Sequence, residues 1–154
     1  MATENKATTA DAQLILQLYD LRREAELRKA RNFVATFSPK SFEELMQVVS
    51  AFGTQENAWF RQVYGYWEMA ASLVLRGAVD QTLFDDNSAE MYFVYAKIKP
   101  FLKQLRETLN SPEFLIKIEK AIERNPEGQK RLALVEQRIA QFAKTRAQSS
   151  AAAD

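Results

Sequence analysis

Residues 64–80 read YGYWEMAASLVLRGAVD, and this stretch decides the fold. On a helix, its polar or small positions fall three or four residues apart and form one narrow stripe. These positions, counted from one turn earlier, are Arg61, Gly65, Glu68, Ser72 and Arg76. Nearly all other positions are aromatic or aliphatic. The stretch therefore predicts a central helix with neighbours on most of its sides.

The glutamate in this apolar helix raises three hypotheses. Glu68 is solvated if the stripe is the one edge of the helix that faces water. It is held by an arginine from another segment if Gly65 and Ser72 let a second backbone approach, because an unpaired buried carboxylate is very unfavourable. It belongs to a binding site if the glycine leaves room for a ligand. The candidate binding residues are then Arg61, Tyr64, Trp67, Glu68, Ser72 and Arg76.

The rest of the chain also predicts helices. Only four glycines and four prolines occur among 154 residues, too few for a hairpin-rich β architecture. Capping signals place helices over about residues 11–37, 41–53, 55–76, 88–109, 113–124 and 126–147. The fourth contains Pro100, so we expect a kink or a break near residues 97–100.

The economical fold is a single all-α domain over residues 10–147, a bundle or irregular array of about five to seven helices. We expect residues 1–9 and 148–154 to be disordered, because their polar and small side chains offer no apolar face. No stretch is apolar enough for a secretory signal or a membrane-spanning helix, so the expected location is the cytoplasm.

One set of short motifs suggests a family. The chain has WE at 67–68, RGAVD at 76–80, Phe84, and MYFVYAKIKPFL at 91–102. Together these residues resemble a group of small bacterial helical proteins classed only as a domain of unknown function, over roughly residues 56–105. The resemblance implies a helical fold and no particular activity.

Composition argues against most catalytic chemistry. The chain has no histidine and no cysteine, so ordinary zinc and haem sites and thiol nucleophiles are not expected. Its glycines are too scattered for a nucleotide-binding loop. The formal net charge of +1 gives no general attraction to nucleic acid or an anionic membrane. We therefore expect no metal or other cofactor, and a protein that is not an enzyme.

Acidic and mixed-charge segments have ordinary structural explanations. Five carboxylates are close enough in sequence to consider as an acid–base pair: Glu68, Asp80, Asp85, Asp86 and Glu90. The three aspartates stand where capping and the helix dipole favour acidic residues. The segment RREAELRKAR at 22–31 mixes both signs, with Glu24 and Arg28 in the favourable order, and predicts a solvated helix face.

Two apolar patterns favour association. The last helix has a heptad-like line and is basic, so it could meet an acidic partner or a second copy. The candidate interface residues are Tyr92, Phe93, Leu132, Ile139 and Phe142. If Leu14, Leu18 and Leu21 pair with the last helix, the bundle is self-contained. Otherwise these leucines and the apolar line of the last helix both need a partner chain.

The leading hypothesis is a non-enzymatic protein that associates with itself or with another protein. The alternative is a small-molecule binding protein with a pocket beside Trp67 and Glu68.

Overall fold

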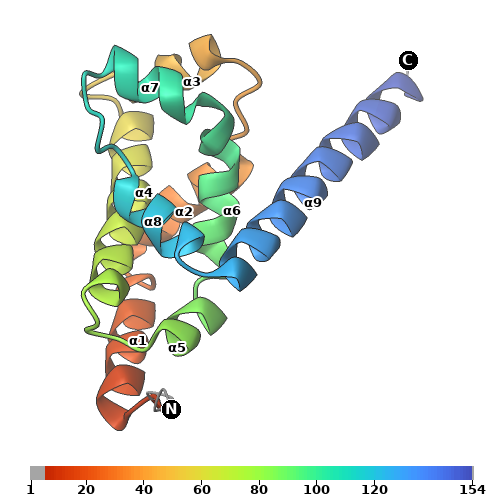
Figure 1. Cartoon of the computed structure of the whole chain (residues 1–154). Helices are drawn as coiled ribbons and strands as arrows, with labels where there is room; N and C mark the ends of the chain where they lie inside the picture. The colour runs from red at the N-terminus through yellow and green to blue at the C-terminus, as the bar shows by residue number, and fades with distance from the viewer. Residues whose placement is uncertain (1–5, 154) are drawn as a thin grey trace.

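The computed structural model describes residues 6–153, and this part of the chain is all-α without strands (Figure 1). The helices are α1 (Thr9–Leu21), α2 (Ala25–Thr36), α3 (Phe42–Val49), α4 (Gln55–Leu75), α5 (Gln81–Asp86), α6 (Ala89–Ile98), α7 (Leu102–Thr108), α8 (Ile116–Glu123) and α9 (Pro126–Ala151). A short 3-10 turn, η1 (Lys99–Phe101), separates α6 from α7. The predicted all-α class is thus confirmed, whereas the expected number of five to seven helices and the kink at Pro100 are not.

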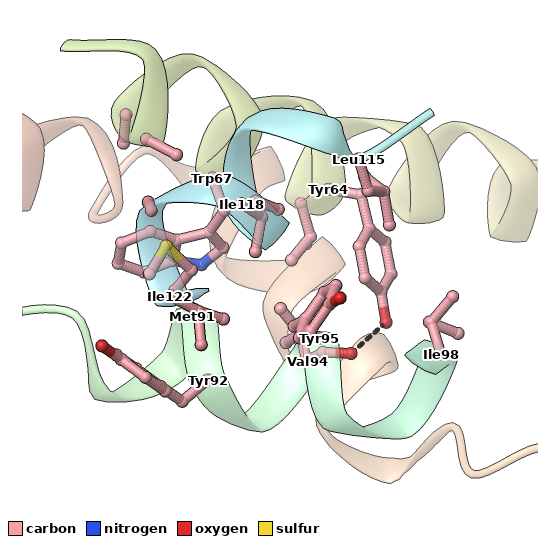
Figure 2. Packing of buried hydrophobic residues seen from close by; sticks show 14 of the residues in the cluster. Tyr64, Trp67, Met91, Tyr92, Val94, Tyr95, Ile98, Leu115, Ile118 and Ile122 are labelled. Carbon is pink, nitrogen blue, oxygen red and sulfur yellow. Dashed lines mark hydrogen bonds between the residues drawn. The ribbon is translucent and has the colours of Figure 1, made fainter. Parts of the chain in front are cut away.

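Helix α4 is central, as its sequence predicts. It packs against α2, α3 and α8, and it buries aromatic side chains along much of its length. Figure 2 shows Tyr64 and Trp67 projecting from α4 toward α6 and α8, where the Tyr64 hydroxyl donates to the Val94 carbonyl at 2.9 Å. Thr54 caps the start of α4, and Gly77 follows its end with a φ of +75°. Both ends were expected from local sequence alone.

The prediction of one continuous helix over residues 11–37 is wrong, because the chain turns at residues 22–24 between α1 and α2. Glu24 caps the new helix, its carboxylate accepting from the Leu27 amide at 2.9 Å. The Arg28 guanidinium donates to the Arg23 carbonyl at 2.9 Å, so the expected side-chain pairing of Arg28 with Glu24 is replaced by a bond across the turn. The turn lets α2 fold back along α4 and bury Ala30 and Val34 completely.

A buried lysine joins α2 to α6. The Lys97 ammonium donates to three carbonyls at the end of α2, those of Val34, Ala35 and Phe37, the last at 2.7 Å. These carbonyls lack partners within their own helix, so the ammonium completes the end of α2. Burial lowers the pKa of Lys97 to about 8 because the charged form is poorly solvated there.

Several helix boundaries differ from the sequence prediction. Helix α3 ends at Val49 rather than at Gly53. The fifth predicted helix does not begin at Ser111–Pro112: residues 112–115 form turns, Leu115 has a φ of +55°, and α8 starts at Ile116. The predicted disordered tail is also wrong for residues 148–151, which continue α9. Alanine favours helix there, and the Ser149 and Ser150 hydroxyls bond to carbonyls one turn earlier. Residues 1–5 and 154 of the predicted disordered ends lie outside the described residues.

Helix α9 packs on α6 and α8 through its first turns and then leaves the body of the protein (Figure 1). Gly128 allows this seat: a Cβ there would lie 2.6 Å from the Ile122 carbonyl oxygen. Of the two alternatives for the leucines of α1, pairing with α9 is not the one that the structure shows. Helix α1 instead packs on α5, and Leu21 is 53% exposed.

Among residues 6–153, no helix is both long and apolar enough to cross a membrane.

Candidate functional site

Glu68 holds the start of α8. Its two carboxylate oxygens accept from the backbone amides of Lys117 and Ile118, each at 3.0 Å, and the Lys117 ammonium lies 3.5 Å away. Leu115 precedes α8 in a left-handed conformation and provides no side-chain cap, so a carboxylate from α4 takes that place. The hypothesis of a second segment holding Glu68 is right in kind, but the partner is backbone rather than arginine.

The other predicted binding residues do not converge on Glu68. Arg61 bonds to Asn57 one turn back along α4, and the Ser72 hydroxyl bonds to the Met69 carbonyl. Tyr64 is buried, and Arg76 is exposed at the end of the helix. Gly65 is exposed, with nothing within 4 Å of the position a Cβ would take, so no second backbone approaches there.

Replacing Glu68 with alanine should lower the free energy of unfolding by about 1 kcal/mol, the usual effect of losing an N-terminal cap. The amides of Lys117 and Ile118, in the first turn of α8, would lose their acceptors, while the core around α4 would be unchanged. Lys117→Ala is the matched control, because an ion pair with an exposed lysine contributes little. Urea denaturation of both variants measures the difference. Equal stability of Glu68→Ala and wild type would contradict the capping role.

A second partly buried carboxylate, at Glu90 of α6, is held by side chains rather than by backbone amides. One oxygen accepts from the Trp67 indole nitrogen at 3.1 Å, and the other accepts from Arg22 at 3.2 Å and Arg31 at 2.6 Å. Burial acts to raise the pKa of Glu90, but the hydrogen bonds from Arg31 and Trp67 and the two positive charges outweigh it and hold that pKa below its usual value. The carboxylate is therefore ionised at neutral pH and joins α1, α2, α4 and α6.

Beside this cluster lies a pocket of about 260 Å³, formed between α1, α4 and α5. Its lining includes Leu16, Leu18, Tyr19, Arg22, Tyr66, Trp67 and Phe84. The Arg22 guanidinium carbon lies 5.2 Å from the centre of the Trp67 ring and 5.8 Å from that of Tyr19. The pocket is thus apolar and aromatic with one cation at its edge. Trp67 and Glu68 were both predicted to line a pocket. Trp67 lines this one, whereas Glu68 does not.

A second hollow, of about 470 Å³, runs between α6 and residues 131–142 of α9. We call it the α9 groove; it is lined by Ala89, Phe93, Arg131, Leu134, Val135, Arg138, Ile139 and Phe142. Three of the predicted interface residues, Phe93, Ile139 and Phe142, meet here. The other two are core residues: Tyr92 is fully buried beneath Arg131, and Leu132 is only 7% exposed.

Comparison with known families gives one match. Residues 7–125 match the model described as a domain of unknown function, DUF4760. The chain belongs to this family. The DUF4760 match contains every residue of the pocket beside Trp67, and it stops just before α9, so one wall of the α9 groove lies outside it. No curated protein and no solved structure gave a significant match.

The pattern of charges in this DUF4760 chain did not reveal the cluster at Glu90. Arg22 and Arg31 lie in the segment predicted to be a solvated face, but their side chains are only 15% and 29% exposed. The turn at residues 22–24 causes the difference, because it brings both arginines to one side. Glu90 was noticed only as one of five nearby carboxylates. A glutamate on an otherwise buried face of α6 was the available signal.

Proposed function

We propose that the protein works by association with another protein through the α9 groove, which receives an amphipathic helix bearing acidic residues. The observation that carries this proposal is the exposed apolar line on α9. Phe142 is 75% exposed and Leu134 is 54% exposed, beside Ile139 and the Phe93 ring. Large apolar side chains grouped in a groove at this exposure are typical of a protein-binding surface.

The outer half of α9 supports the same proposal. The Lys99–Glu136 ion pair, at 2.7 Å, joins η1 to α9. Beyond this ion pair, from residue 140 to residue 153, every side chain is exposed. Helices of about a dozen residues are marginally stable in water without tertiary packing. A partner helix alongside α9 would cover Phe142 and stabilise this part of the chain.

Charge favours an acidic occupant. Between residues 137 and 153 the cations are Arg138, Lys144 and Arg146, and this stretch contains no aspartate or glutamate. The same stretch of a second copy, packed into the groove, would add the same three cations and no carboxylate, so electrostatic repulsion opposes that form of self-association. An amphipathic helix with glutamates flanking its apolar face would satisfy both the apolar line and the cations.

Two short synthetic helices with the same leucine face test the proposal, one flanked by glutamate and the other by lysine. Fluorescence anisotropy should show binding of the acidic peptide that weakens as salt is added, with no binding of the basic peptide. Phe142→Asp should reduce the affinity about tenfold or more, because it places a like charge and a polar group at the centre of the contact.

Phe52→Asp is the matched control, since Phe52 is also 75% exposed but lies beyond α3, outside the groove. It should leave peptide binding unchanged. Equal loss in both variants, or equal binding of both peptides, would contradict the groove as the binding site. Equilibrium sedimentation of the protein alone tests which molecule occupies the groove. If the protein is a dimer and Phe142→Asp disrupts it, the occupant is a second copy of the chain and not an acidic helix of another protein.

A further inference from the structure

We propose that the pocket beside Trp67 binds a small apolar carboxylate, with Arg22 as its cationic partner. This site is separate from the α9 groove and does not depend on the function proposed for it. The argument rests on the walls of the pocket, on the hydrogen bonds that Arg22 makes, and on the local balance of charge.

The walls select an apolar molecule. Leu18 and Phe84 are buried beneath the pocket, and the rings of Tyr66 and Trp67 meet edge to face at 5.0 Å. At the rim, Leu16 is 66% exposed and Tyr19 is 58% exposed, so two large apolar side chains stand beside an unfilled hollow. A bound ring or branched chain would cover both. The volume of about 260 Å³ limits the occupant to a small molecule.

Arg22 has unused hydrogen-bonding capacity. Its Nη2 donates to Glu90 at 3.2 Å, but Nε is buried and has no acceptor within the described chain. A guanidinium offers donors in a planar fork that matches the two oxygens of a carboxylate. The side chain is 15% exposed, so it can meet a ligand while most of it stays fixed against Trp67.

The charges around Arg22 favour an anion. Two guanidiniums, those of Arg22 and Arg31, share the single carboxylate of Glu90. One formal positive charge is therefore left in a partly buried cluster at the edge of an apolar pocket. A ligand carboxylate would neutralise it, whereas a ligand amine would meet a like charge.

Phenylacetate and phenethylamine test the site, because they pair similar apolar groups with opposite charges. Amide NMR spectra of the full chain would follow the indole signal of Trp67, assigned with Trp59→Phe. Phenylacetate should shift this signal in a saturable way at about millimolar concentration, as expected for a ligand of this size. Phenethylamine should leave it in place. No saturable shift with phenylacetate, or the same shift with both compounds, would overturn the proposal.

Two surface substitutions on α1 locate the binding. Leu16→Glu places a carboxylate at the rim and should weaken phenylacetate binding about tenfold or more through repulsion. Leu21→Glu makes the same change at another exposed position of α1, outside the pocket, and should leave the affinity as in wild type. Both residues are more than half exposed, so both variants should fold. Equal affinities in the two variants would place the ligand elsewhere and overturn the assignment.

Discussion

Replacing Glu90 with glutamine should lower the free energy of unfolding by about 3 kcal/mol, because removing one partner of a buried ion pair leaves uncompensated charge. Glutamine keeps the size of the side chain but turns the carboxylate into an amide. Arg22 and Arg31 would then lie close together without a counter-charge, and with side chains only 15% and 29% exposed they would be incompletely solvated. The contacts that Glu90 makes among α1, α2, α4 and α6 would all weaken together.

Glu43→Gln is the matched control for this substitution. Glu43 is an exposed residue in the first turn of α3, so removing its charge should change stability by less than about 0.5 kcal/mol. Urea denaturation monitored by circular dichroism measures both variants. A Glu90→Gln protein as stable as the Glu43→Gln protein would show that the arginines find other partners and that the cluster is not a structural centre.

The pH dependence of stability gives a second measure of the same interaction. The pKa of Glu90 is lowered in the folded protein, so its ionised form contributes stability that is fully present above the unfolded value of about 4.5. That contribution is lost as the pH falls through the lower folded value. The difference in stability between wild type and Glu90→Gln should therefore shrink as the pH falls below the unfolded pKa of about 4.5 and through the folded pKa of Glu90. Asp11 and Glu24, whose pKa values are also lowered, are present in both proteins and affect both equally.

The parts of the fold that depend on local sequence could be predicted. The first helix begins within a few residues of the predicted start, where Thr8 and Asp11 form a capping box, and α9 begins at residue 126 as predicted, with Asn125 as its cap. Gly77 ends α4 in the left-handed conformation that glycine adopts without strain. In each case the residues that decide the structure lie within one helical turn of one another, so a single sequence contains the whole signal.

The interactions that define the candidate sites are long-range and could not be predicted in this way. Glu68 caps α8 through the amides of Lys117 and Ile118, which are 49 and 50 residues further along the chain. Arg22 and Glu90 are 68 residues apart. Charge pattern alone suggested a solvated face for Arg22, because an arginine followed by glutamates on a helix is usually exposed. Only the turn before α2, which no glycine or proline announces, brings the arginine to Trp67.

The two helical glycines provide the sharpest contrast between sequence and structure. One of the three hypotheses for Glu68 had Gly65 mark a close approach, yet the space around it is open. Gly128 is where helices touch: a Cβ would lie 2.6 Å from the Ile122 carbonyl oxygen and 3.1 Å from the Tyr92 hydroxyl. We expect Gly65→Ala to raise the free energy of unfolding by up to about 1 kcal/mol, since alanine favours a helix over glycine.

Gly128→Ala should instead lower the free energy of unfolding by about 2 kcal/mol, because overpacking against backbone outweighs the gain in helix propensity. The obstacle is a carbonyl of α8, which cannot rotate away as a side chain can. Helix α9 would have to lift from α8, and its seat on Tyr92 through Arg131 would loosen. Thermal and urea denaturation of the two alanine variants measure the opposite signs. A Gly128→Ala protein stabilised like Gly65→Ala would mean that α9 is free to shift, and that the α9 groove has no fixed shape for a partner to recognise.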